Sequence, residues 1–223
     1  MSIFSGVNRV IFDLDNTLIK HNFELANINI SKHLGLEGSE EFKAQLDNMF
    51  KYNAKYIKGK IVTKEYFAYI IETLMPILKT IDKTGLDLLD VIDKYHSGTL
   101  MEGADELLAY LSEKGYQIVV LTNWFYSYQR KILDRLGISK YFERIYAWDD
   151  YYAKPSHFAI IRALENTKPN NNVLIGDDGL SDITLAKTSG LKAIGFNVDY
   201  SRNSNVLRAD VDVTRLVDIQ KYL

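Results

Sequence analysis

The 223-residue sequence has no cysteine, three prolines and no long apolar run. Without cysteine, disulfide bonds and thiolate metal sites are excluded. No segment approaches the roughly 18 consecutive apolar residues of a membrane-spanning helix, so we predict a cytoplasmic protein with no membrane partner. The histidines are too far apart in the chain for the usual spacing of a zinc site; they are His21, His33, His96 and His157.

An excess of charge of one sign is also lacking. The 27 lysine and arginine residues nearly balance the 29 aspartate and glutamate residues, and the formal net charge is −2. Proteins that bind nucleic acid draw much of their affinity from basic side chains placed along the phosphate backbone. Because the basic residues here are scattered, we predict no nucleic-acid partner.

Apolar residues make up 47% of the chain, and many of them gather in short runs separated by amphipathic stretches. Four runs are typical of strands buried on both faces: residues 10–12, 118–121, 173–175 and 193–196. Helical periodicity lies between them, as in residues 104–114 and 181–189. This alternation predicts an α/β fold, a Rossmann-like parallel sheet with helices on both faces.

One long stretch breaks the alternation. Residues 21–100 carry helical periodicity and hardly any strand signal, with expected helices at 25–34, 40–57, 63–74 and 86–95. Helix-breaking residues separate them, namely Gly35, Gly59, Pro76 and Gly85. We therefore predict an all-helical domain at 21–100, inserted into a core domain formed by residues 1–20 and 101–223.

Polar residues follow the predicted strands, where ligands bind in open parallel sheets. Asp13 and Asp15 follow the first strand, Thr122 the second and Asp177 the third, and Lys154 lies between the last two of these. Neighbouring carboxylates repel each other unless a cation or a proton relieves the repulsion. The pattern therefore predicts a cation site at the carboxyl edge of the sheet.

These residue types suit phosphoryl chemistry. Carboxylate oxygens are the ligands that Mg²⁺ prefers, and Mg²⁺ leaves room for a phosphate group. Lys154 and Thr122 can join the metal in neutralising the phosphoryl oxygens. One carboxylate can attack phosphorus to give an aspartyl-phosphate, while the second protonates the leaving alcohol and later activates water.

The order of these residues resembles the haloacid dehalogenase (HAD) superfamily, in its phosphatase branch with a helical cap inserted between the first and second motifs. Residues 13–17 (Asp-Leu-Asp-Asn-Thr) match the first of four motifs. The other three match Thr122-Asn123, Lys154-Pro155, and Gly176-Asp177 with Asp182. The resemblance implies that Asp13 is the nucleophile and Asp15 the acid/base. It also implies that Mg²⁺ is held by the Asp13 side chain, the Asp15 backbone carbonyl and Asp177.

The remaining site predictions follow from the same motifs. Thr122 and Lys154 are predicted to act in catalysis. Asp178 and Asp182 are predicted to orient water or lysine behind the metal ligands. Predicted contacts to the phosphate group come from Asn16, Thr17, Thr122, Asn123 and Lys154.

The predicted function is hydrolysis of a small phosphorylated metabolite, such as a nucleoside monophosphate or a sugar or organic-acid phosphate. A phosphomutase, a dehalogenase and a catalytically quiet binding module are the alternatives. All eight arginines lie outside residues 20–102, so the insertion lacks the planar side chain that grips a second phosphate, which disfavours a mutase. Asp15 disfavours a dehalogenase, because it supplies the acid/base that a phosphate ester needs. The oligomeric state stays open.

Overall fold

The computed structural model describes residues 3–46, 63–95, 98–148, 152–202 and 205–223. The chain forms two compact units. The first joins Met1–Lys20 to Thr99–Leu223, and the second spans His21–Gly98. Among the described helices, none is both long and apolar enough to cross a membrane.

The first unit contains a six-stranded parallel sheet in the order β5-β4-β1-β6-β7-β8. The four predicted strands are confirmed, and two more were not predicted. The missed strands, β5 and β8, are three residues each and contain a charged side chain, so they carry no apolar run. The strands are β1 Arg9–Phe12, β4 Gln117–Leu121, β5 Arg144–Tyr146, β6 Asn172–Gly176, β7 Lys192–Phe196 and β8 Val211–Val213.

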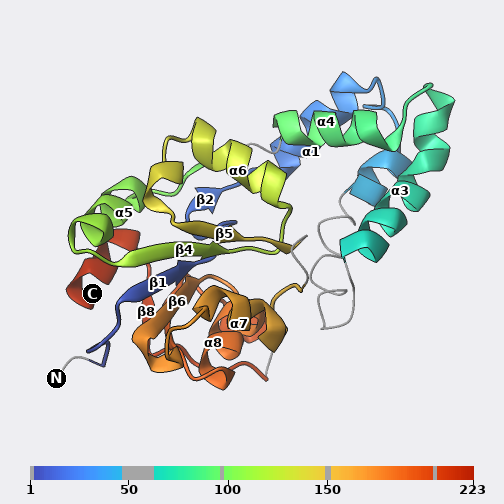
Figure 1. Ribbon diagram of the computed structural model, residues 1–223. Coiled ribbons are helices and arrows are strands. Elements are labelled where there is room, and N and C mark those ends of the chain that lie inside the picture. Colours follow the sequence, from blue (N-terminus) through green and yellow to red (C-terminus); the bar gives the residue numbers. More distant parts are fainter. Residues whose placement is uncertain (1–2, 47–62, 96–97, 149–151, 203–204) are drawn as a thin grey trace. The chain divides into compact units, whose positions relative to one another are not determined.

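Helices cover both faces of this sheet, as predicted. Figure 1 shows α5 (Ala104–Glu113) and α6 (Tyr126–Arg135) on one face and α7 (His157–Leu164) and α8 (Leu185–Thr188) on the other. One core cluster joins apolar residues of β1, β4 and β6, such as Ile11, Val119 and Leu174, with those of α7 and α8. Short helical turns complete the unit at Ser139–Tyr141, Pro169–Asn171, Gly179–Thr184, Tyr200–Arg202 and Leu216–Lys221.

Strand β1 lies between β4 and β6, with Phe12 opposite both Val120 and Ile175. The backbone N–H of Asp13 donates to the carbonyl of Ile175 at 2.9 Å, which continues the sheet pairing one residue further. The segments that follow these three strands therefore meet at one edge. From β1 the strand order runs to β4 on one side and to β6 on the other. In open α/β sheets, ligands bind at the carboxyl edge next to such a point.

Among the described residues of the second unit, the regular elements are helices. It contains α1 (Phe23–His33), a helix over residues 40–46, α3 (Thr63–Thr80) and α4 (Gly85–Tyr95). The remainder of the predicted 40–57 helix lies outside the described residues. The unit ends at Gly98, because the next two residues form β3 (Thr99–Leu100), which pairs antiparallel with β2 (Ile19–Lys20) in the first unit.

The boundary predicted near Pro76 is wrong, because α3 continues through this proline to Thr80. Proline removes one helical hydrogen bond but does not prevent the chain from continuing. Leu74 and Leu78 are four residues apart on one helix face, and both are buried. The free energy gained by burying Leu78 offsets the hydrogen bond lost at Pro76. This gain depends on tertiary contacts, so the local sequence does not indicate it.

Candidate active site

A buried lysine lies at the centre of the predicted site. The Nζ atom of Lys154 is 2.6 Å from Oδ1 of Asp13 and 2.5 Å from Oδ1 of Asp182. All three side chains are buried. Buried charges require partners that satisfy them, and here one ammonium group serves two carboxylates. The residues after β1, before α7 and within the turn after β6 are thus joined by one ionic cluster.

The cluster contains more negative charge than Lys154 balances. Burial raises the pKa of Asp13 to about 7; the nearby Lys154 opposes this, and the carboxylates of Asp182 and Asp15 add to it. Burial, with the charges of Asp13 and Asp182, raises the pKa of Asp177 to about 8. For Lys154, burial lowers the pKa, but the attraction of Asp13 and Asp182 outweighs it and the pKa rises. Ionisation of every carboxylate at neutral pH therefore calls for a further cation.

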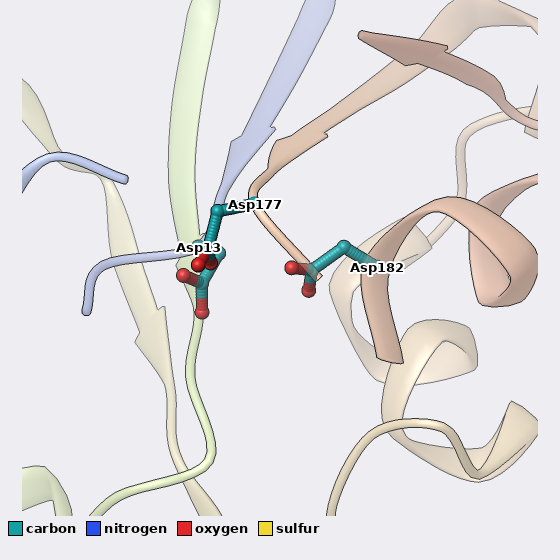
Figure 2. A group of neighbouring side chains, drawn as sticks. All are labelled: Asp13, Asp177 and Asp182. Atoms are coloured by element: carbon teal, nitrogen blue, oxygen red, sulfur yellow. The ribbon is translucent and has the colours of Figure 1, made fainter. Parts of the chain in front are cut away.

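The arrangement of the carboxylates suits such a cation. One carboxylate oxygen from each of Asp13, Asp177 and Asp182 lies within 4.8 Å of the others. Figure 2 shows Asp13 and Asp177 at the ends of neighbouring strands, whereas Asp182 approaches from the helical turn after β6. Both oxygens of Asp182 already accept hydrogen bonds, from Lys154 and from the backbone N–H of Asp178. Asp13 and Asp177 are therefore the side chains best suited to a divalent ion.

The two acids after Asp177 have separate tasks. Asp178 accepts hydrogen bonds from the backbone N–H groups of Leu180 and Ser181, so it caps the helical turn Gly179–Thr184. Asp182 is buried and bonds Lys154. Gly176 lies against Asp182, and a Cβ atom there would collide with its carboxylate. Asp182 thus contacts the lysine of the cluster, whereas Asp178 shapes the loop; the predicted roles of both residues behind the metal ligands stay predictions.

Thr17 and Asn16 shape the loop after β1. The hydroxyl of Thr17 is buried and donates to Oδ1 of Asp177 at 3.4 Å, which orients a predicted metal ligand. Asn16 has a φ of 65°, a left-handed conformation that asparagine tolerates better than most residues. Its backbone N–H donates to the carbonyl of Ile19 at 2.7 Å. The predicted phosphate contacts of both residues stay predictions.

Asn123 anchors the segment that carries the lysine. Its side-chain amide donates to the carbonyl of Lys154 at 3.0 Å and accepts from the backbone N–H of Lys154 at 2.7 Å. Two hydrogen bonds to one residue hold the Lys154 backbone at the end of β4. The side chain of Asn123 is thus engaged within the protein, and its predicted phosphate contact stays a prediction.

Sequence reasoning missed one buried residue of the site. Gln129, in the first half of α6, donates from Nε2 to Oδ2 of Asp15 at 2.8 Å and to Oγ1 of Thr122 at 3.2 Å. Both Gln129 and Thr122 are buried. One signal in the sequence could have identified it. Gln129 is a polar residue on the helix face that carries the apolar residues Ile132 and Leu133, and a polar side chain on a buried face indicates a specific partner.

The chain is thus an α/β protein with a cluster of carboxylates and one lysine at the carboxyl edge of its parallel sheet, and these carboxylates could hold a cation. The chain belongs to the haloacid dehalogenase-like hydrolases, whose family model matches residues 7–190. The predicted family is thus confirmed. The family match identifies the chain as a hydrolase, and the solved structures share its Rossmann-like fold.

Curated relatives cover most of the chain at low identity. A phosphoglycolate phosphatase of Aquifex aeolicus is 29% identical over 82% of this chain and 81% of its own length. A ribulose-1,5-bisphosphate 5-phosphatase of Halopiger xanaduensis is 28% identical over 84% of both chains. The pyrophosphatase PpaX of Halalkalibacterium halodurans is 25% identical over 96% of this chain and 98% of its own length.

Solved structures share the fold over nearly the whole chain. The HAD-hydrolase YfnB from Bacillus subtilis, in a magnesium-bound form, has a TM-score of 0.73 at 20% identity, covering 96% of this chain and 98% of its own. The L-2-haloacid dehalogenase from Xanthobacter autotrophicus has the same TM-score at 14% identity, covering 96% and 97%. At these identities the likeness concerns the fold alone.

The raised carboxylate pKa values predict how magnesium and pH affect stability. Between about pH 4 and 8, folded Asp13 and Asp177 bind more protons than in the unfolded chain, so they lower the free energy of unfolding as pH rises. With EDTA, we expect Asp177→Asn to melt higher than the unmodified protein at about pH 8 and close to it at about pH 5.

Divalent cations bind ionised carboxylates in preference to protonated ones, so we expect Mg²⁺ to raise the melting temperature of the unmodified protein more at about pH 8 than at about pH 5. Thermal unfolding followed by circular dichroism at both pH values, with EDTA or with Mg²⁺, measures these differences. Equal stabilisation by Mg²⁺ in Asp177→Asn would contradict the assignment of Asp177 as a metal ligand.

Proposed function

We propose that this chain hydrolyses small phosphomonoesters through a phosphorylated Asp13, with Mg²⁺ as cofactor. One observation carries the proposal: Asp13 is buried beside Lys154 and Asp177 at the carboxyl end of the central strand. Burial strips the carboxylate of most of its water, and the neighbouring cation holds it ready to meet an anionic phosphoryl group. The curated relatives named as phosphatases support the same reaction class.

The first step transfers the phosphoryl group to the protein. An oxygen of Asp13 forms a bond to phosphorus while the bond from phosphorus to the ester oxygen breaks. Asp15 gives its proton to that departing oxygen, so an alcohol leaves. Lys154 and the Thr122 hydroxyl offset the negative charge of the phosphoryl oxygens.

The second step releases phosphate. A water oxygen attacks phosphorus of phospho-Asp13, and Asp15 accepts the proton of that water, since it gave up its own in the first step. Inorganic phosphate leaves and the Asp13 carboxylate is restored. Asp13, Asp177 and the backbone carbonyl of Asp15 would hold Mg²⁺, which supplies charge neutralisation at the phosphoryl group when bound.

We assign the helical unit His21–Gly98 to substrate selection, as a cap domain. It is an insertion in the hydrolase core, and the catalytic residues proposed above all belong to the other unit. When one domain carries the catalytic residues and another selects the substrate, the same catalytic core can act on many different phosphate esters. The relatives named for phosphoglycolate and ribulose bisphosphate favour small organic-acid or sugar phosphates as substrates.

The two-step reaction predicts a defined outcome in a substrate screen. We expect phosphate release from one or more small phosphomonoesters, lost on removal of Mg²⁺ with EDTA and regained when Mg²⁺ is added back. The panel should contain organic-acid, sugar and nucleoside phosphates together with pyrophosphate, with phosphate measured colorimetrically. A 2-haloacid in the same panel, with halide measured, tests the dehalogenase alternative.

Each other outcome selects against the proposal. Phosphate release that survives EDTA would exclude the metal-dependent reaction. Halide release without phosphate release would favour a dehalogenase. Movement of phosphate between positions of a sugar, without net release, would identify a mutase. Mg²⁺ binding without turnover of any compound would favour a binding module.

A further inference from the structure

The buried amide of Gln129 links two residues of the proposed reaction. Its Nε2 atom lies 2.8 Å from Oδ2 of Asp15 and 3.2 Å from Oγ1 of Thr122. A carboxylate oxygen without a proton only accepts hydrogen bonds, so the nitrogen of the amide, rather than its oxygen, faces Asp15. The two hydrogens of that nitrogen can serve the two partners at once.

The other end of the same amide is poorly satisfied. Oε1 of Gln129 is buried and has no hydrogen-bond partner among the described residues. A buried acceptor without a donor costs stability, and an apolar side chain of similar size would avoid that cost. The buried positions one turn further along α6, Ile132 and Leu133, are apolar. Gln129 therefore lowers the stability of the fold, and its contacts with Asp15 and Thr122 offer a functional reason for a glutamine at this position.

Each contact restricts one group of the site. The hydrogen bond to Oδ2 restricts rotation of the Asp15 carboxylate. Gln129 is buried on α6 and cannot move with the carboxylate, so rotation of Asp15 would break the bond. Donation to Oγ1 of Thr122 uses an acceptor site of that hydroxyl, so its own hydrogen is left to donate elsewhere. A phosphoryl oxygen is the acceptor that the proposed reaction supplies.

We propose that Gln129 is a positioning residue for phosphoryl transfer, which holds the Asp15 carboxyl group toward the leaving oxygen and the Thr122 hydroxyl toward the phosphoryl group. The proposal rests on the phosphatase function proposed above and adds a residue to it. Gln129 acts through Asp15 and Thr122, and it need not touch the substrate.

Leaving-group dependence separates positioning from simple support of the fold. An alkoxide is a poor leaving group and needs the proton that Asp15 delivers, whereas 4-nitrophenolate departs readily without one. The Gln129→Met variant keeps the side-chain volume and removes the donor. We expect it to lower kcat/KM by about 10- to 100-fold for an alkyl phosphate and by a few-fold at most for 4-nitrophenyl phosphate.

A matched control lies on the same helix. Leu133 is buried in α6 and apolar, so Leu133→Ala weakens packing without removing a donor to Asp15. It should lower the melting temperature and leave the ratio of the two kcat/KM values unchanged. Should Gln129→Met not fold, Gln129→Asn keeps the amide but shortens its reach by one methylene, and the same change in the ratio is expected.

A double variant tests the route through Asp15. In an Asp15→Asn background the acid is already absent, so adding Gln129→Met should not change the ratio further. Equal losses for both substrates in Gln129→Met, or no loss for either, would overturn the positioning role while leaving the phosphatase function intact. Failure of the unmodified protein to release phosphate from either substrate would instead overturn the function, and this role with it.

Discussion

Replacing Asp13 by asparagine is expected to abolish turnover, with kcat lowered by about 10⁴-fold or more. The amide is nearly the same size as the carboxylate but is a poor nucleophile toward phosphorus, so no aspartyl-phosphate can form. Phosphate release with Mg²⁺, measured on the best substrate of the screen, gives the magnitude. Mass spectrometry of the peptide that contains Asp13, after rapid quenching, should detect the added phosphoryl group in the unmodified protein and not in the variant.

A matched control for this substitution is Asp90→Asn. Asp90 is exposed on α4, so the same chemical change there should leave kcat unaltered. Folding of Asp13→Asn is not expected to suffer, because burial and the nearby carboxylates already make an ionised Asp13 costly. Turnover that persists in Asp13→Asn would exclude Asp13 as the nucleophile.

Replacing Lys154 by methionine is expected to damage both stability and activity. The side chain is buried and its Nζ bonds both Asp13 and Asp182. Its removal leaves two buried carboxylates without their cation, which costs about 3–5 kcal/mol of unfolding free energy at neutral pH without Mg²⁺. We also expect kcat to fall by at least about 100-fold, because a positive charge at the phosphoryl group is lost. Urea unfolding and phosphate release measure the two effects.

A second substitution distinguishes charge balance from lost packing. Adding Asp182→Asn to Lys154→Met removes one of the uncompensated carboxylates, and it should restore at least about 1 kcal/mol of stability. The backbone N–H of Asp178 can still donate to the new amide oxygen. Turnover should stay low, because Asp13 still lacks its lysine. Failure of the second substitution to restore stability would indicate that the loss in Lys154→Met came from packing instead of charge.

Much of the fold was predictable from local patterns. Strands buried on both faces appear as apolar runs, and β1, β4, β6 and β7 each showed one. Strands β5 and β8 each contain a charged residue, Arg144 and Asp212, so neither shows an apolar run. Helix α3 continues through Pro76 because burial of Leu78 stabilises the turn beyond it. That burial depends on tertiary packing, so the local sequence does not indicate it.

The site residues after strand ends were predictable for a related reason. Asp13 and Thr122 each follow an apolar run directly, and Asp177 follows one after Gly176. Parallel strands bring their carboxyl ends to one edge whatever their order. Lys154 does not directly follow a predicted strand; it was identified from its place between two of them and from its motif. Its burial between two carboxylates is a property of the folded chain.

The division of labour among neighbouring acids required the structure. Asp178 and Asp182 have the same side chain and are four residues apart, yet one caps a turn and the other bonds a lysine 28 positions away. Gln129 was not predicted, because its partner Asp15 is 114 positions away. Residue type and spacing along the chain thus identified the chemistry of the family. Hydrogen bonds between distant residues depend on strand order and helix packing, and these decided which side chain serves which partner.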